Sequence, residues 1–249
     1  MTRIASHRGG TLEFGDSTPS GFKATAGMAL EEVEFDLHPT SDGEIFVHHD
    51  PTLDRTTDQT GAISDHPARK VRSAVIDYSA GQSPLTLTEL CAIYHDSPVD
   101  FRCEIKPGAD GNPYTDFVPR VVQTLAENEL LDRTVFSSFL IDTLDELGSA
   151  SERPRLWLVS PAVLTQLGLK AVIDVAIAHS IPEIGVHIDR ANAQMTTEVT
   201  DAGLEFGCWA AHDGTQIDKA LALGIKVFTT DRPTLAIARR RSLASEAAA

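Results

Sequence analysis

The stretch EVEFDL at residues 32–37 alternates acidic and apolar side chains. A period of two is the period of a β-strand, so Glu34 and Asp36 point to one face while the apolar side chains point to the other. In a half-exposed sheet the acidic face would meet solvent. In a closed barrel the outer face packs against helices, which suits the apolar set and turns both carboxylates toward the interior. The stretch therefore favours a barrel if other strands can complete one.

Short β-rich runs of this kind recur along the chain. They are RIASHR (3–8), EVEFDL (32–37), VDFRCEI (99–105), TVFSSF (134–139), RLWLVS (155–160), IGVHI (184–188), EFGCWA (205–210) and KVFTT (226–230). Stretches with helical spacing lie between them, as at residues 117–131 and 217–224. By length alone the chain fits one barrel or two small domains. The alternation of strands and helices predicts an α/β fold, a single (β/α)8 TIM barrel over residues 1–249.

One interval departs from this alternation, between residue 36 and the strand at 99–105. A Ser-Asp-Gly turn followed by EIFVHHD (44–50) predicts a hairpin strand. Residues 50–85 are rich in Thr, Asp and Gly and predict a long surface insertion after the second strand. Long loops in compact domains are usually functional, so we expect this insertion near the substrate.

Composition narrows the class of protein. The net charge of −15 disfavours nucleic-acid binding, because such binding needs many Lys and Arg contacts to phosphates. No apolar run approaches the roughly 20 residues of a membrane span, and the N-terminus lacks a basic region followed by a hydrophobic segment. Cys91, Cys103 and Cys208 are widely spaced and odd in number, which favours reduced thiols. We expect a cytoplasmic protein that binds a small molecule; a homo-oligomer stays open.

Polar and reactive side chains gather near the ends of the predicted strands. They are His7, Arg8, Glu34, Asp36, Glu104, Lys106, Ser137, Ser138, His187, Trp209 and Asp231. Active sites of such barrels form at the carboxyl ends of the strands. The sequence therefore concentrates chemistry where this fold would place it.

The alternation of EVEFDL recurs in FRCEIKP (101–107), where Glu104 and Lys106 share a face. Glu34, Asp36 and Glu104 would then converge from adjacent strands, and like charges repel unless a cation or proton lies between them. All-oxygen ligation suits Mg²⁺ or Ca²⁺ better than Zn²⁺. Lys106 would either pair with Glu104 or reach a phosphate oxygen.

Two histidines come to the same end of the barrel. His49 closes the predicted hairpin strand, and His7 ends the first strand. A pair of imidazoles that flank one bond provides a general base and a general acid. His48 alternates to the other face and is expected to be structural, and His187 and His212 are weaker site candidates. Surface or packing roles are expected for the remaining four: His38, His66, His95 and His179.

Several of these segments, in this order, resemble the glycerophosphodiester phosphodiesterase family. They are HRGG (7–10), EFD (34–36), HHDPTLDRTTDQTG (48–61), PLTLTEL (84–90), CEIKP (103–107), SSF (137–139), WAAHD (209–213) and FTTDRP (228–233). The resemblance covers nearly the whole chain. It implies a barrel of the PLC-like phosphodiesterase type and a phosphoric diester hydrolase, which uses a divalent metal to convert a glycerophosphodiester to glycerol 3-phosphate and an alcohol.

The resemblance also implies roles for individual residues. Glu34, Asp36 and Glu104 would be the metal ligands. His7 and His49 would be the acid–base pair, and we assign His7 as the base and His49 as the acid. The nucleophile is either water or a neighbouring hydroxyl of the substrate, which would first give a cyclic phosphate.

The remaining roles concern the phosphate and the organic part of the substrate. Arg8 and Lys106 would contact the phosphate, where their charge offsets the charge of the transition state. Asp50 would position His49 or its loop. Trp209 would pack against the organic part of the substrate.

Two departures from the family pattern leave the substrate open. Residues 15–18 read Gly-Asp-Ser-Thr where the family usually has Pro-Glu-Asn-Thr, and residues 210–213 read Ala-Ala-His-Asp where it usually has Thr-Val-Asn-Asp. Asp16 and Ser17 are still expected to cap the next helix. A sugar phosphodiester of the opine or agrocinopine type is the leading alternative substrate. A phospholipase D-like lyase is disfavoured by the polar insertion, and a non-catalytic binding module by the retention of all five metal-ligand and histidine positions.

Overall fold

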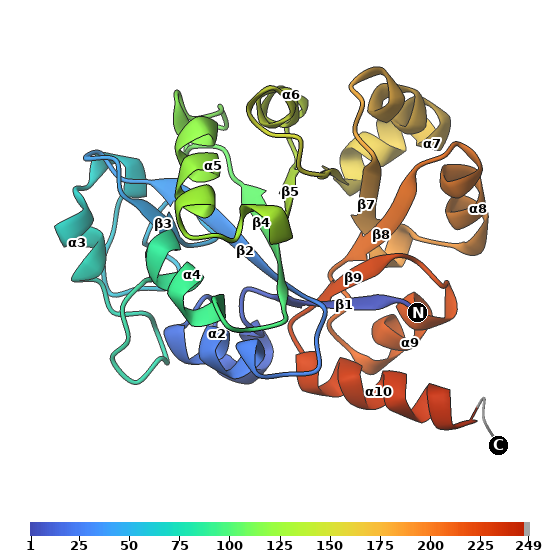
Figure 1. Cartoon of the computed structure of the whole chain (residues 1–249), viewed down its shortest axis with the longest axis horizontal. Helices are drawn as coiled ribbons and strands as arrows, with labels where there is room; N and C mark the ends of the chain where they lie inside the picture. Colours follow the sequence, from blue (N-terminus) through green and yellow to red (C-terminus); the bar gives the residue numbers. More distant parts are fainter. Residues whose placement is uncertain (247–249) are drawn as a thin grey trace.

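The computed structural model describes residues 1–246 and contains a closed barrel of parallel strands surrounded by helices (Figure 1). The barrel strands are β1 (Arg3–His7), β2 (Glu32–Pro39), β4 (Asp100–Ile105), β5 (Thr134–Ser138), β6 (Arg155–Val159), β7 (Glu183–His187), β8 (Glu205–Trp209) and β9 (Val227–Thr230). Each pairs in parallel with its neighbour, and β1 closes the ring by pairing with both β9 and β2. The predicted (β/α)8 barrel is confirmed, with each strand within two residues of its expected bounds.

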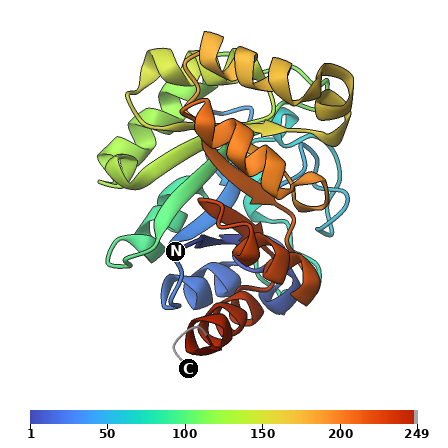
Figure 2. The same ribbon diagram turned by 90° about the vertical axis from the view of Figure 1, so that its right-hand side faces the viewer.

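Helices follow the strands around the outside of the barrel. They are α1 (Thr11–Phe14), α2 (Pro19–Ala26), α3 (Ala68–Arg72), α4 (Leu87–Tyr94), α5 (Phe117–Glu127), α6 (Ile141–Ala150), α7 (Pro161–Ala178), α8 (Ala193–Asp201), α9 (Gly214–Ala222) and α10 (Pro233–Glu246). Short 3-10 turns lie at Ile63–Asp65, Leu131–Arg133 and Ile188–Arg190. Figure 2 shows the helices around the strands in a second view. Helix α10 contacts the chain just before β1, where Arg240 Nη1 donates to the Thr2 carbonyl at 3.4 Å.

The alternation in β2 sorts its side chains between the barrel interior and the helical layer. All eight residues of the strand are buried. Val33, Phe35 and Leu37 belong to the main apolar core, in which the edge of the Phe101 ring meets Phe35 with ring centroids 4.8 Å apart. The acidic residues between them face the interior. Both faces of β2 are therefore excluded from solvent, as a barrel requires.

The hairpin after β2 is shorter than the sequence suggests. Strand β3 (Ile45–Val47) pairs antiparallel with β2, and His49 lies two residues beyond its end instead of closing it. The following segment, expected as a surface loop, encloses a second apolar cluster. Its buried members are Phe46, Leu53, Ile63, Val71 and Ala74. The insertion thus has its own small core, built from apolar residues too widely spaced to show a period.

The cap of α2 differs from the expectation. Thr18 is the N-cap, and its hydroxyl accepts a hydrogen bond from the Gly21 backbone N–H at 3.0 Å. Neither of the two residues before it caps the helix, because Ser17 has a left-handed backbone with φ of 55° and its hydroxyl donates to Asp16. The Asp16 carboxylate instead contacts Arg8 and Arg55. Asp16, which was expected to cap the helix, therefore contributes to the ion contacts at the mouth of the barrel.

One helix in the described part of the chain, α7, is long and apolar enough to cross a membrane by length and composition. Its backbone is interrupted at Gly168, where φ is 76° and ψ is 158°. Each helical piece is consequently well short of the roughly 20 residues that a span requires. The three cysteines, Cys91, Cys103 and Cys208, are free and buried, as expected.

His38 connects β2 to the segment that carries His49. Its Nε2 lies 3.1 Å from the His49 carbonyl and its Nδ1 lies 2.9 Å from the Tyr114 hydroxyl. An Nε2–H tautomer donates to the carbonyl and accepts from the hydroxyl, so the neutral ring satisfies both contacts. Burial lowers the pKa of His38 from its ordinary value of 6.5 to about 4.

We expect His38→Gln to flatten the loss of stability on acidification. Between pH 6.5 and 4 the unfolded chain binds a proton at His38 that the folded chain does not. The free energy of unfolding therefore falls as pH falls, by at most about 1.4 kcal/mol per pH unit from this residue. Urea unfolding at pH 7, 6 and 5 measures the slope. His95→Gln, at a side chain that is 58% exposed, is the control. Equal slopes for wild type and His38→Gln would contradict the prediction.

Candidate active site

Three carboxylates converge inside the mouth of the barrel. Glu34 and Asp36 come from β2 and Glu104 from β4, and one oxygen of each lies within 4.8 Å of the others. The register explains the meeting, because Asp36 and Glu104 are partners in adjacent strands. None is more than 5% exposed. The predicted convergence is thus observed.

The three carboxyl groups differ in their affinity for protons. Burial and the neighbouring carboxylates raise the pKa of Glu34 well above its ordinary value. Burial raises that of Glu104 to about 7, against the opposing effect of Lys106. Burial also acts to raise the pKa of Asp36, but the cations Lys106 and Arg8 outweigh it and hold that pKa below its usual range. The cluster therefore has a negative charge at Asp36 and two carboxyl groups whose affinity for protons is raised.

Two cations border this cluster. Lys106 Nζ lies 2.6 Å from Glu104 Oε1 and 3.1 Å from Asp36 Oδ1, and Arg8 Nε lies 3.2 Å from Asp36 Oδ2. Both Asp36 oxygens and Glu104 Oε1 are buried, and these ion contacts are their only partners among the described residues. Ion contacts with two cations therefore balance the charge of the acidic cluster.

The HRGG segment makes a sharp turn that places Arg8 beside the carboxylates. Arg8, Gly9 and Gly10 have φ values of 50°, 75° and 88°. A Cβ on Gly9 would lie 3.0 Å from the backbone nitrogen of Phe22, so the second residue of the turn must be glycine. Arg8 is the only one of these three residues that carries a side chain. A left-handed backbone at a non-glycine residue is strained. Such strain is typical of functional sites.

His7 is held by a carboxylate from the far end of the chain. Its Nδ1 lies 2.5 Å from Asp231 Oδ1, and its Nε2 lies 3.8 Å from Glu34 Oε2. His212 also approaches Asp231, with Nδ1 at 3.3 Å from Oδ2 and at 3.0 Å from the Asp231 backbone N–H, which donates to it. Because Asp231 accepts from Nδ1 of His7, the Nε2 atom of that ring is turned toward the acidic cluster.

His49 is held in the same way by a local carboxylate. Its Nδ1 lies 2.5 Å from Asp50 Oδ1, and Arg55 Nε donates to Asp50 Oδ2 at 2.5 Å. Arg55 also reaches Asp16, which in turn contacts Arg8 Nη1 at 3.2 Å. Burial lowers the pKa of His49 below its ordinary value. A chain of alternating charges thus ties the hairpin loop to the HRGG turn.

These groups surround one cavity of about 200 Å³. Seven of the eight predicted site residues line it, namely His7, Arg8, Glu34, His49, Glu104, Lys106 and Trp209. Asp36 lies behind them, fully buried. Apolar residues also line the cavity: Phe139 and Trp209 pack edge to face with ring centroids 5.8 Å apart, and Leu158 joins them in the lining. The lining therefore combines charged and apolar side chains.

Some residues of the site were missed in the sequence. Asp231 and Ser137 stood out as polar strand ends, but no role could be assigned to them. Asp16 was expected to cap a helix. Arg102 and Phe139 were not singled out, although the first lines the cavity from two residues below Glu104 on β4. An arginine among apolar neighbours in the middle of a buried strand was the signal available for it.

Comparison with known proteins decides the family. Residues 7–235 match the Glycerophosphoryl diester phosphodiesterase family. The chain belongs to this family. The predicted resemblance is confirmed, and the family places the chain among the phosphoric diester hydrolases.

Individual relatives agree over the whole length of the chain. A curated glycerophosphodiester phosphodiesterase of Caldanaerobacter subterraneus subsp. tengcongensis is 22% identical, with 93% of this chain and 95% of that protein covered. A crystal structure from Agrobacterium tumefaciens str. C58, of a protein whose name places it in the same family, is 68% identical, with a TM-score of 0.98 over 98% of this chain and 99% of the other. An Oleispira antarctica phosphodiesterase in complex with the product sn-glycerol-3-phosphate shares the fold, with a TM-score of 0.80 at 18% identity over 97% of each chain.

We expect Glu104→Gln to stabilise the metal-free protein at pH 8. The folded pKa of about 7 lies above the ordinary value of 4.5, so stability is lost as pH rises between these values, and the amide removes that loss. A gain of about 1 kcal/mol would raise the melting temperature by roughly 2–4 °C in EDTA, with little difference at pH 5. Exposed Glu152→Gln is the control. A lower melting temperature than wild type at pH 8 would contradict the like-charge repulsion.

Proposed function

We propose that this protein hydrolyses a glycerophosphodiester to glycerol 3-phosphate and an alcohol. The observation that carries the proposal is a single cavity lined by buried carboxylates and by two histidines. The Nδ1 atom of each histidine contacts a further carboxylate, Asp231 or Asp50. Family membership and the named relatives support the substrate class. The product complex of the Oleispira antarctica phosphodiesterase supports the same chemistry for this fold.

Glu34, Asp36 and Glu104 are the residues that would hold a divalent metal. Their donor set contains only carboxylate oxygens, and one oxygen of each residue lies within 4.8 Å of the others, so the cluster fits a hard cation such as Mg²⁺ or Ca²⁺. The second cluster of possible ligands, His7, His212 and Asp231, is already satisfied by its internal contacts. When bound, the metal supplies positive charge that offsets the charge of the phosphoryl group.

Arg8 and Lys106 would bind the phosphate. Both line the cavity beside the acidic cluster and carry their charge in a largely buried position, where electrostatic interactions are stronger than in water. Contacts with Asp16 and Asp36 hold the Arg8 guanidinium in place before substrate arrives. A phosphodiester anion would therefore meet preorganised cations in a chain whose net charge is −15.

His7 and His49 would move the protons of the reaction. With Nδ1 bonded to Asp231, neutral His7 can accept a proton from the nucleophile at Nε2. With Nδ1 bonded to Asp50, protonated His49 can donate from Nε2 to the leaving alkoxide. The nucleophile is water or the neighbouring hydroxyl of the glycerol, and phosphorus NMR of the product distinguishes glycerol 3-phosphate formed directly from a cyclic phosphate formed first.

If a metal binds at the acidic cluster, it should raise the melting temperature of the protein, and Glu34→Gln should abolish this increase. At a hundredfold excess over Kd, a bound ion adds about 2.7 kcal/mol, which corresponds to roughly 5–10 °C in melting temperature. We expect Mg²⁺ or Ca²⁺ to raise the melting temperature of wild type and of His212→Asn but not of Glu34→Gln. EDTA should abolish turnover. A shift lost in His212→Asn and kept in Glu34→Gln would place the ion in the other cluster.

The two histidines are distinguished by the leaving group. We expect His49→Ala to lose at least about 100-fold in kcat on glycerophosphocholine, whose alcohol needs a proton, and much less on a glycerophosphodiester with p-nitrophenol as the leaving group. His7→Ala should lose activity on both, because the nucleophile always needs a base. His95→Ala is the surface control. Equal losses of His49→Ala on the two substrates would refute its role as the acid.

A further inference from the structure

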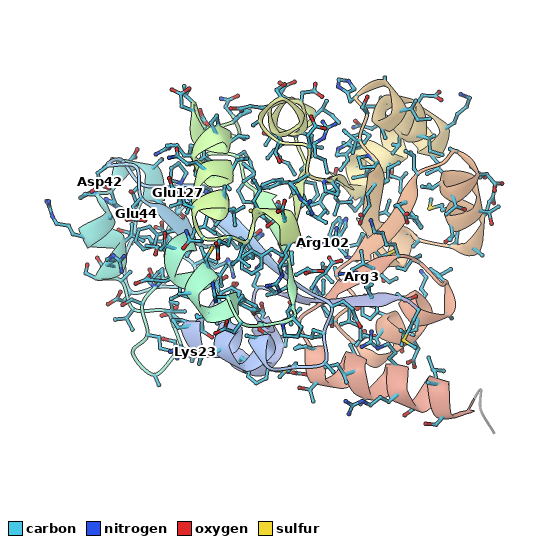
Figure 3. The ribbon with its side chains drawn as sticks, viewed as in Figure 1. Arg3, Lys23, Asp42, Glu44, Arg102 and Glu127 are labelled. Carbon is cyan, nitrogen blue, oxygen red and sulfur yellow. The ribbon has the colours of Figure 1, made fainter. Side chains whose placement is uncertain are left out.

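The carboxylate that holds His7 lies at a short seam of the barrel. Asp231 directly follows β9, and β9 lies between β8 and β1, the strand on which Figure 3 labels Arg3. Within residues 1–246, the register between β8 and β9 contains one residue pair, Cys208 with Phe228, whereas β7 is in register with β8 along its whole length. The ladder of paired residues therefore ends before Asp231, and other contacts must fix that residue.

The loop after β8 supplies these contacts. Ala210 has a left-handed backbone with φ of 65°, so the regular strand ends there. The Ala211 N–H still donates to the Thr229 carbonyl at 3.0 Å. In a parallel ladder the next bond would run from the Asp231 N–H to a backbone carbonyl of the neighbouring segment. Here that N–H donates instead to Nδ1 of His212, at 3.0 Å. The imidazole thus replaces a backbone acceptor.

His212 also contacts the side chains of the pair that it supports. Its Nδ1 lies 3.3 Å from Asp231 Oδ2, while Asp231 Oδ1 lies 2.5 Å from His7 Nδ1. The rings of His7 and His212 pack with their centroids 5.5 Å apart. Both histidines line the cavity, and the His212 side chain is 29% exposed. His212 therefore contacts Asp231 at the backbone and at the carboxylate, and it packs beside the ring of His7.

The backbone N–H determines which nitrogen of His212 carries the proton. A ring nitrogen that accepts from an N–H is unprotonated, so the neutral ring has its proton on Nε2. Burial lowers the pKa of His212, and Arg8 acts in the same direction against the effect of Asp231. The positive end of α9 begins at the next residue, Asp213, and also disfavours an imidazolium. His212 thus supports Asp231 as a neutral acceptor and not as a counter-charge.

Loss of this acceptor would affect His7 through Asp231. Asp231 is buried, and among the described residues its N–H has no partner besides His212. Its carbonyl is held separately, by the Leu12 N–H at 3.2 Å. Without the imidazole the buried N–H would lack an acceptor, and the backbone would shift to find one. A shift at Asp231 moves the carboxylate that orients His7, and small displacements of a catalytic group lower kcat strongly.

We propose that His212 is a positioning residue for the proposed base. Its Nδ1 holds the backbone of Asp231, and the Asp231 carboxylate in turn holds Nδ1 of His7, so that Nε2 of His7 is turned toward the acidic cluster. His212 is not a second base, because its remaining nitrogen, Nε2, already carries the proton of the neutral ring. The inference rests on the proposed function, in which His7 accepts the proton of the nucleophile.

The kinetic test uses two variants of nearly equal shape. An asparagine at position 212 can place its amide oxygen where Nδ1 lies, whereas a leucine there offers no acceptor. We expect His212→Leu to lower kcat at least about tenfold with little change in KM, on glycerophosphocholine and on the p-nitrophenyl diester alike. His212→Asn should stay within about threefold of wild type. His179→Leu is the control, because it removes an imidazole that contacts Asp145 at 2.8 Å outside the cavity.

A double-mutant comparison separates this role from a general loss of structure. In the His7→Ala background Asp231 has no imidazole to orient, so His212→Leu should cause little further loss of kcat on the p-nitrophenyl diester. An equal loss from His212→Leu in both backgrounds would contradict the proposal, as would equal kcat values for His212→Leu and His212→Asn.

NMR of the full chain labelled with ¹⁵N-histidine tests the arrangement without turnover. In EDTA at about pH 8 we expect one histidine with an unprotonated, hydrogen-bonded Nδ1 and a protonated Nε2, whose signals are absent from His212→Leu. The downfield proton between His7 and Asp231 should persist in His212→Asn and shift or broaden in His212→Leu; His49→Ala identifies the similar proton at Asp50.

A proton on Nδ1 of His212, or an unchanged His7 signal in His212→Leu, would overturn the proposal. Absence of turnover on every glycerophosphodiester would refute the proposed function, whereas the NMR signals would still decide whether His212 holds Asp231 and His7.

Discussion

Asp36 lies fully buried between Arg8 and Lys106, and the rest of the site depends on this contact between buried charges. A lone carboxylate in the barrel would take up a proton. The two cations keep Asp36 ionised, and its charge then raises the proton affinity of Glu34 and Glu104 beside it. The cluster is consequently poised to exchange protons for a metal ion, and the cations beside it are poised to meet a phosphate.

The catalytic candidates are held in place by carboxylates outside the acidic cluster. Asp231 fixes the ring of His7 and Asp50 fixes the ring of His49, and within residues 1–246 the Nε2 atom of each ring makes no hydrogen bond. Asp16 joins the two sides of the mouth through its contacts with Arg8 and Arg55. Side chains that are already held by such contacts lose little conformational entropy when substrate binds. The site is therefore largely preorganised for catalysis.

The interior of the barrel holds a second group of buried charges. Glu32, Glu183 and Arg102 form a buried ion group below the site, in addition to the acidic cluster above it. Replacing such groups by apolar residues is often neutral or stabilising in other proteins. Removing one partner alone, in contrast, leaves an uncompensated buried charge and is strongly destabilising.

The sequence predicted well what depends on local period. The alternation of β2 and β4 predicts which side chains enter the barrel, and it fixed the candidates Glu34, Asp36, Glu104 and Lys106 correctly as neighbours. The cap of α2 was wrong, since three adjacent polar residues are equally good caps by type and only the left-handed backbone at Ser17 decides for Thr18. The core of the insertion was missed because its apolar residues have no regular spacing.

The sequence by itself determined the strands, the faces of their side chains and the family, because these follow from period and from short motifs. Only the tertiary structure decided how distant groups pair. Asp231 meets His7 across 224 residues, and Arg102, Ser137 and Trp209 line one cavity from three strands. Hydrogen bonding depends on distance and direction in space, which closure of the barrel sets and no spacing along the chain reveals.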